Sequence, residues 1–333
     1  MTVVRPADRA AEFSTSSDPG ACSVRSESLD EPAYGTAAVA RGWVALEQPG
    51  PWGRDAAAES HLDHGLGREL GARAAAGGGR FVLIRAAGAH PDDHHGRPRT
   101  VLVSCGLPGR EWLLTGTVTD PRTLLELDVD AVTRGDRTAV LASVPGLVAS
   151  PSPVFLVCTN GRRDVCCAVR GRPVARDAAA QRPGQVWETS HTGGHRFAPT
   201  GVLLPSGVTL ARVTAPDVLA ALDAAAQDEL PAYLLGPRHD RGRSALSPTE
   251  QAAESAVRAL TRTVGLNAVR VSETVDVSAG TRVRIDHGAF GEAAASTTVL
   301  VRRTLREPDR RVSCGKEPES QQVYVVDVPG DLP

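Results

Sequence analysis

The order of apolar runs in the middle of the chain limits its possible folds most strongly. An apolar run at 154–157 is followed by a polar loop, an alanine-rich stretch at 172–181 and a second apolar run at 186–189. A glycine-rich loop then leads to two further apolar runs, which the turn residues Pro-Ser-Gly at 205–207 separate. Leucine and alanine recur at helical spacing over 215–229. The segment therefore predicts a strand, a helix, a strand, a hairpin and a closing helix.

This order of elements is the thioredoxin-like arrangement, a four-stranded mixed sheet with helices on its faces. We predict an α/β fold in which residues 149–246 form that domain. Residues 21–148 also alternate between short apolar runs and helical stretches, and we interpret them as a degenerate α/β domain. The strands expected there are Gly42–Glu47, Phe81–Arg85, Thr100–Cys105 and Trp112–Val118, and the expected helices are Asp55–Ala75 and Pro121–Ala131.

The two ends of the chain read differently from its centre. Residues 1–20 are polar and show no periodicity, so we expect a disordered tail. Within 247–333, Ser247-Pro-Thr-Glu is typical of a helix start, with a capping serine and a proline in the first turn. Several apolar runs follow it, so we predict a helix and a small β-rich appendage.

Composition excludes several classes of function. The 333 residues carry 37 Lys and Arg against 39 Asp and Glu, so the strongly basic surface that neutralises nucleic-acid phosphates is not expected. The apolar runs are too short to cross a bilayer, and the first residues contain no apolar stretch typical of secretion. We therefore expect a cytoplasmic protein with reduced thiols. Its six cysteines are too few for a disulfide scaffold, so their spacing must indicate their role.

One group of cysteines and histidines has the pattern of a metal centre. Cys158 ends a predicted strand and is followed by Cys166 and Cys167, and the next strand leads to His191-Thr-Gly-Gly-His195. Thiolates bind soft metals and iron–sulfur clusters, and neutral imidazoles bind iron or zinc through one ring nitrogen. The two glycines allow a tight loop in which both rings face one point. We predict a site of two thiolates and two imidazoles, with Cys166 or Cys167 as the second thiolate.

The spacing favours an iron–sulfur cluster over a single ion. Structural zinc sites use cysteines two to four residues apart, whereas seven residues separate Cys158 from Cys166 and eight separate it from Cys167. A [2Fe–2S] cluster is a larger group, and in Rieske centres two histidines replace two cysteines on one iron. A structural zinc module of a binding protein remains an alternative. A thioredoxin-like thiol redox protein is a third, although adjacent cysteines form only a strained disulfide and no Cys-x-x-Cys is present.

The two motif segments resemble a known family. CTNGRRDVCCAVRGRPVA and WETSHTGGHRFAPTGVLLPSG look like the sucrase/ferredoxin-like family, in its thioredoxin-like [2Fe–2S] ferredoxin branch. The stretches LEQPGPWG and SCGKEPE are also similar to that family, so the resemblance extends from about Cys22 to Lys316. It implies that the cluster ligands are Cys158, Cys167, His191 and His195, with Cys166 as the alternative to Cys167.

The expected function is electron transfer, with a redox partner protein that the sequence does not identify. Because histidine ligands carry an exchangeable proton on the outer ring nitrogen, we expect redox to be coupled to protonation. We expect an electron carrier rather than an enzyme, because no pair of carboxylates is placed for glycoside hydrolysis and sucrase activity has no support. Cys22, Cys105 and Cys314 lie far from the motif in the sequence, and we expect them to be structural.

Overall fold

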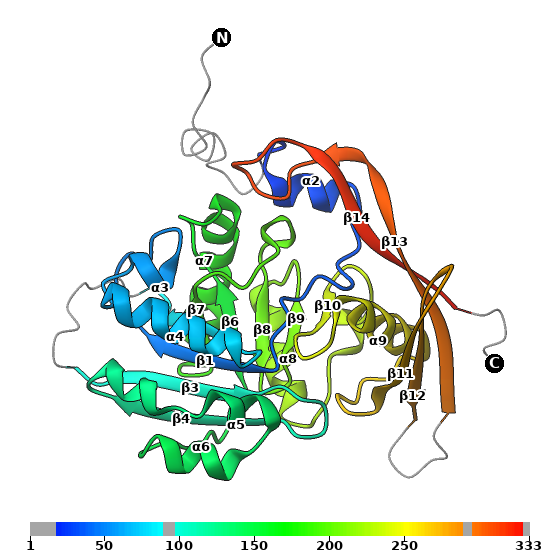
Figure 1. Cartoon of the computed structure of the whole chain (residues 1–333). Helices are drawn as coiled ribbons and strands as arrows, with labels where there is room; N and C mark the ends of the chain where they lie inside the picture. The colour runs from blue at the N-terminus through cyan, green and yellow to red at the C-terminus, as the bar shows by residue number, and fades with distance from the viewer. Residues whose placement is uncertain (1–17, 89–96, 289–294, 329–333) are drawn as a thin grey trace.

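The computed structural model describes residues 18–88, 97–288 and 295–328. Most of the tail predicted at 1–20 therefore lies outside the described residues. Within these residues the first helix is α2 (Cys22–Ser28). Ten of the strands that follow form one large mixed sheet, and four more form a separate antiparallel sheet near the C-terminus (Figure 1). The α/β fold class predicted from the sequence is confirmed.

The first half of the large sheet is built from residues 42–149. β1 pairs in parallel with β2, and β3, β4 and β5 extend the sheet on the other side of β1 in antiparallel order. Its elements are β1 (Gly42–Glu47), α3 (Ala56–Glu59), α4 (His64–Ala76), β2 (Arg80–Arg85), β3 (Arg99–Cys105), β4 (Trp112–Val118), η1 (Pro121–Glu126), α5 (Val129–Arg134), α6 (Arg137–Ser143) and β5 (Val148–Ala149).

The second half repeats this plan. β6 pairs in parallel with β7, and β8, β9 and β10 extend the sheet on the other side of β6 in antiparallel order. Its elements are β6 (Val154–Cys158), α7 (Val165–Gln181), β7 (Val186–Thr189), η2 (His195–Phe197), β8 (Gly201–Leu204), β9 (Val208–Leu210), α8 (Ala215–Ala225), η3 (Ala232–Leu234) and β10 (Asp240–Arg243). The predicted order of strands, helix, hairpin and closing helix is present, but the predicted four-stranded sheet is wrong, because β10 pairs with β9 and adds a fifth strand to this half.

The two halves are joined edge to edge. The full strand order is β10-β9-β8-β6-β7-β2-β1-β3-β4-β5, so the antiparallel pair of β2 and β7 lies at the centre. Arg85 of β2 and Glu188 of β7 form a buried ion pair of 2.7 Å across this seam. The two halves therefore share one continuous sheet, and the interpretation of residues 21–148 as a related α/β unit is supported by the matching strand order.

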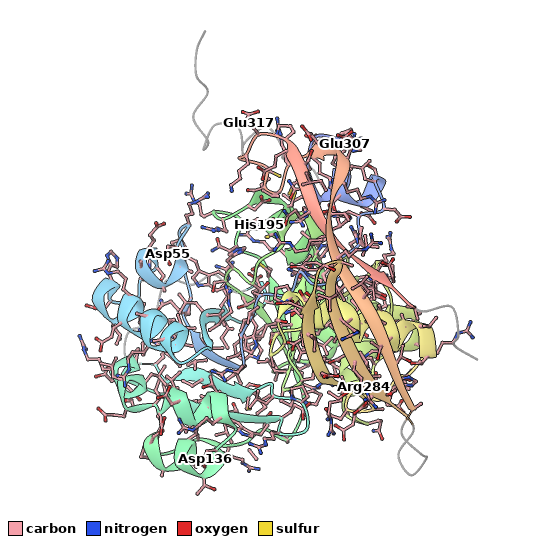
Figure 2. The ribbon with its side chains drawn as sticks, turned by 45° about the vertical axis from the view of Figure 1, so that its right-hand side comes forward. Asp55, Asp136, His195, Arg284, Glu307 and Glu317 are labelled. Carbon is pink, nitrogen blue, oxygen red and sulfur yellow. The ribbon has the colours of Figure 1, made fainter. Side chains whose placement is uncertain are left out.

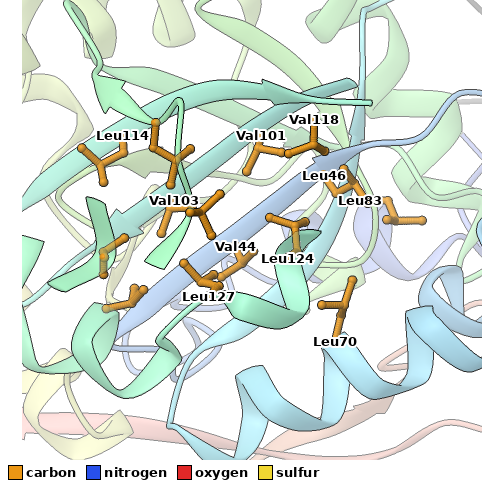
Figure 3. Close-up of a cluster of buried hydrophobic side chains, with 14 of the residues drawn as sticks. Val44, Leu46, Leu70, Leu83, Val101, Val103, Leu114, Val118, Leu124 and Leu127 are labelled. Atoms are coloured by element: carbon orange, nitrogen blue, oxygen red, sulfur yellow. The ribbon is translucent and has the colours of Figure 1, made fainter. Parts of the chain in front are cut away.

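Three apolar clusters stabilise the large sheet. One cluster fills the space between the first half and its helices, where side chains such as Val44, Leu70 and Leu124 meet (Figure 3). A second packs the other half against α7 and α8. The third contains side chains from both halves, including Trp43 and Leu156, so the halves are packed together as well as hydrogen-bonded.

The C-terminal segment forms the predicted helix and β-rich appendage. α9 (Pro248–Thr261) begins at the Ser247 cap, whose hydroxyl accepts a hydrogen bond from the Glu250 N–H. The helix packs its apolar face against an antiparallel meander. The strands of this meander are β11 (Val269–Val277), β12 (Gly280–His287), β13 (Ala295–Arg310) and β14 (Glu319–Asp327). In Figure 1 the β13–β14 hairpin reaches back over α2.

Three helix predictions need correction. The stretch Pro121–Ala131 is a short 3-10 helix, η1, followed by the start of a separate helix, α5, which Asp128 caps. The helix expected over 172–181 begins seven residues earlier, at Val165, because Asp164 caps it. The stretch Asp55–Ala75 is two helices, since the chain is extended at Ser60 and Asp63, where Asp63 begins a new cap. Across the residues that the structure describes, none of the helices has the length and apolar character needed to span a bilayer.

Candidate metal centre

The start of helix α7 lies directly beside the end of strand β6. Cys158 is the last residue of β6, and the chain returns over a short turn to α7. Gly171 permits this close approach, because a Cβ atom at that position would lie 2.4 Å from the carbonyl oxygen of Cys158. The absence of a side chain at Gly171 therefore lets the first turns of α7 pack against Cys158.

The cysteine doublet lies in the first turn of α7. The Asp164 carboxylate accepts a hydrogen bond of 2.9 Å from the N–H of Cys166 and caps the helix. Successive residues of an α-helix point in directions about 100° apart. Cys166 and Cys167 are both buried and face different neighbours. The sequence pattern predicts that the doublet lies in a loop, and this prediction is wrong. Because the doublet lies in a helix, the two thiols point in different directions.

Cys167 faces the other predicted ligands. Its Sγ lies 3.5 Å from Nδ1 of His195, and its thiol is hydrogen-bonded to the Cys158 sulfur. The rings of His191 and His195 stack with centroids 4.4 Å apart and an interplanar angle of 18°. We call these four residues the thiol–imidazole site. The structure brings all four predicted residues together, and it brings Cys167, not Cys166, to this site.

The histidine loop is held by residues that are distant in sequence. Gly193 and Gly194 adopt φ values of +88° and +75°, a region that favours glycine. The Arg241 guanidinium donates to the Gly193 carbonyl at 3.1 Å and to the Thr200 hydroxyl at 2.8 Å. Arg80 of β2 donates to the carbonyl of His191 at 3.3 Å. Both halves of the sheet therefore position the loop that carries the two histidines.

The electrostatics of the site favour one ionised sulfur and a neutral His195 ring. The Cys167 thiol donates to the Cys158 sulfur, and this contact, with the help of His191, holds the pKa of Cys158 well below its ordinary value. The same contact, together with burial, raises the pKa of Cys167. Burial lowers the pKa of His195 to about 3, so its imidazole is neutral at neutral pH and can act as a ligand.

Cys166 belongs to a different cluster, which we call the three-thiol site and define as Cys22, Asp164, Cys166 and Cys314. The Cys166 sulfur lies 3.3 Å from that of Cys314 and 3.6 Å from that of Cys22, and the remaining pair is 3.6 Å apart. All four side chains are buried. Thiol donation from Cys22 and Cys314 lowers the pKa of Cys166 to about 2. Cys22 and Cys314, two of the three cysteines expected to be structural, therefore contact Cys166. The third such cysteine, Cys105, lies in β3 of the first half.

The arginines next to the motif form ion pairs with carboxylates outside the thiol–imidazole site. Arg170 forms an ion pair of 2.8 Å with Glu27, and Arg196 forms one of 2.8 Å with the buried Glu31. The cations that contact the histidine loop are instead Arg80 and Arg241. Neither lies near a motif, so no sequence signal identified them.

The polar groups around the thiol–imidazole site are better explained by a bound metal group than by side-chain packing alone. Two sulfurs and two imidazoles converge where Thr192 Oγ1 and Asn160 Nδ2, in the two site loops, are buried without a hydrogen-bond partner among the described residues. Buried polar groups are nearly always paired, and a bound anionic cluster would accept hydrogen bonds from such donors. Thiolates and neutral imidazoles are donor types that bind soft and borderline metals.

Fold and site together define an α/β protein with buried cysteine donors at the junction of β6 and α7 and partly buried histidine donors in the loop after β7. A family model described as sucrase/ferredoxin-like matches residues 33–232, which is most of the large sheet. The chain belongs to the sucrase/ferredoxin-like family. No curated protein matches the chain, and no solved structure matches it.

Proposed function

We propose that this chain is an electron-transfer protein that holds a [2Fe–2S] cluster at the thiol–imidazole site. The proposed ligands are Cys158, Cys167, His191 and His195. The observation that carries the proposal is the pairing of donors by type. The two thiols contact each other, and the two imidazole rings stack on each other. A two-iron cluster needs one pair of ligands for each iron, and bis-histidine centres place both imidazoles on the same iron.

Burial supports the same arrangement. The side chains of Cys158 and Cys167 are buried at the end of the sheet, while both histidines are partly exposed. The thiolate pair would therefore hold the inner iron and the histidine pair the iron nearer solvent. In Figure 2 His195 lies toward the end of the molecule where Glu307 and Glu317 mark the β13–β14 hairpin. We propose this end as the face that a redox partner protein approaches.

The spacing of the donors argues against a single zinc ion at this site. Within the part of the chain that the structure describes, the set whose ligand atoms all lie within 4.8 Å of one another is the three-thiol site. The donors of the thiol–imidazole site do not converge so tightly. A single tetrahedral ion draws its four ligands together, whereas a two-iron core spreads them. A zinc module at the thiol–imidazole site is therefore the less favoured alternative.

The chain's own residues prepare the site for one-electron transfer. A bound [2Fe–2S] cluster would supply the one-electron couple. Cys158 and Cys167 supply buried thiolates, and Arg241 holds the loop that orients the two rings. Nδ1 of His195 is the ring nitrogen that faces the thiols, so Nε2 is left to carry the exchangeable proton. Proton uptake at this nitrogen is the basis of the proposed proton coupling.

The decisive test is the metal content of the full chain purified without oxygen. We expect about two irons and two sulfides per chain and a reddish-brown visible spectrum. Replacing Cys158 with serine should remove both the iron and the colour. A colourless wild-type protein with zinc in place of iron would contradict the proposal.

The two histidines are tested by the reduction potential. Neutral ligands leave the cluster less negative, so we expect a potential above the about −400 mV of all-thiolate plant-type ferredoxins. The His195→Cys variant retains a ligand at that position, and its potential should fall toward the all-thiolate value. The wild-type potential should decrease as the pH rises through the pKa of the bound histidines. A potential that stays constant between pH 6 and 10 would rule out the coupling.

A further inference from the structure

We propose that the three-thiol site is a second metal site, which holds one zinc ion and ties the N-terminal helix and the β13–β14 hairpin to the start of α7. Its ligands are Cys22, Cys166, Cys314 and Asp164. This site is distinct from the thiol–imidazole site, and the proposal does not depend on the proposed function.

The spacing of the three sulfurs carries the inference. The three Sγ–Sγ distances are 3.3, 3.6 and 3.6 Å. A tetrahedral zinc ion with Zn–S bonds of about 2.3 Å places its sulfur ligands about 3.8 Å apart. The three thiols thus need to move only slightly to enclose one ion. An iron–sulfur cluster, in which cysteines bind different irons, requires a wider spacing.

Asp164 has the geometry of the fourth ligand. Its Oδ1 and Oδ2 lie 3.8 and 3.9 Å from the Cys22 sulfur, and a tetrahedral site with a Zn–O bond of about 2.1 Å gives about 3.6 Å between sulfur and oxygen. Oδ2 accepts hydrogen bonds from the Ser313 hydroxyl at 2.7 Å and the Cys314 N–H at 2.9 Å. Oδ1 accepts hydrogen bonds from the N–H of Cys166 at 2.9 Å and from the Cys22 thiol at 3.8 Å. When the Cys22 thiol loses its proton to bind a metal, the second contact is released and Oδ1 has a lone pair for the cation.

A disulfide explains the cluster less well. A disulfide would pair two of the sulfurs at about 2.05 Å and leave the third buried thiol without a partner of its own kind. A metal ion uses all four groups at once. It would also compensate the negative charge of the thiolates that form when the thiols lose their protons to bind it. The starting turn of α7 adds its partial positive charge to the same place.

The positions of the ligands indicate what the ion would do. Cys22 begins α2, and Cys314 lies in the tip of the hairpin between β13 and β14. Figure 1 shows α2 lying beside this hairpin and above α7. Both cysteines are outside the segment 33–232 that the family model matches, whereas Asp164 and Cys166 are inside it. A bound zinc would therefore anchor both peripheral segments to the start of α7 in the second half, next to Cys167.

The first test is elemental analysis of the full chain, expressed with zinc and iron supplied and purified without oxygen. We expect about one zinc per chain, measured in the same sample as iron and sulfide. If the Cys158→Ser variant contains zinc but no iron, the three-thiol site binds its metal independently of the thiol–imidazole site. No zinc in the wild-type protein, or iron in its place, would overturn the proposal.

The second test compares two cysteine variants that make the same chemical change. Cys314→Ser should lose the zinc and retain the iron and the visible spectrum. Cys105→Ser changes a buried cysteine in β3, remote from both sites in the fold, and should retain both metals. Retention of the zinc in Cys314→Ser, or detection by mass spectrometry of a disulfide between any two of the three cysteines in the wild-type chain, would reject the site.

Discussion

Cys166 and Cys167 are neighbours in the chain, yet they lie in two chemically different surroundings. Cys167 meets one thiol and the imidazole of His195, while Cys166 meets two thiols and a carboxylate. The helix alone produces this difference, because it turns by about 100° between the two residues. A cysteine doublet at a helix start can therefore serve two sites at once, one on each side of the helix.

The largest expected effect comes from exchanging one member of the doublet at a time. Cys167→Ser should remove the visible absorption and the iron, because it removes a ligand of the proposed cluster. Cys166→Ser should retain the colour and lose the zinc. Iron, sulfide and zinc measured on both variants give the answer directly. If Cys166→Ser bleaches the protein and Cys167→Ser does not, the assignment of the two thiols is reversed.

The contrast between the two sites also explains what the sequence could predict. All four members of the thiol–imidazole site lie within residues 158–195, so strand order and spacing were sufficient to propose them together. The three-thiol site joins Cys22 to Cys314 across the whole fold, and a pattern search along the chain has no means to pair them. The doublet left Cys166 and Cys167 as alternatives, because the choice depends on helix phase and on where α7 begins.

The fold was predictable for a related reason. Short apolar runs with sharp Gly and Pro boundaries located strands such as β1 and β4 at their observed bounds. The pairing of β2 with β7 was not predictable, because it depends on edge strands of two separate units meeting. Arg80 and Arg241, which support the histidine loop, lie outside the cysteine and histidine motifs in a chain with 37 Lys and Arg, and only packing distinguishes them.

The next largest effect concerns the link between the two sites. Glu31 is buried between Arg196, which follows His195, and Arg310 of β13, with N–O distances of 2.8 and 2.9 Å. Replacing it with glutamine leaves two buried guanidinium groups without their carboxylate, which costs about 3 kcal/mol in the free energy of unfolding. Urea denaturation at pH 7 measures this loss.

A matched control uses the other carboxylate that binds two arginines. Glu27 pairs with Arg170 and Arg238 at 2.8 and 2.7 Å, but its side chain is 29% exposed. Solvent screens this pair, so Glu27→Gln should cost less than about 1 kcal/mol. If the two variants lose equal free energies of unfolding, burial does not determine how strongly these ion pairs stabilise the protein.

The Glu31 contribution also has a defined pH dependence. Burial opposes its ionisation, but Arg310 and Arg196 prevail and lower the pKa of Glu31. An acid with a lowered folded-state pKa stabilises the protein above its unfolded pKa of about 4.3, and loses that contribution as the pH falls through the folded value. The stability difference between wild type and Glu31→Gln should therefore shrink below about pH 4. A difference that grows toward acid pH would contradict this account.

The smallest expected effect separates the two glycines of the histidine loop. Both have positive φ, so an alanine at either position costs about 1 kcal/mol. A Cβ atom at Gly194 would also lie 2.3 Å from the Arg241 guanidinium, whereas the nearest atom at Gly193 would be 3.7 Å away. Gly194→Ala should therefore lose about 1 kcal/mol more than Gly193→Ala in urea denaturation, and it should shift the visible spectrum by displacing His195. If the two variants behave alike, Arg241 yields to the added methyl group and does not hold the loop in place.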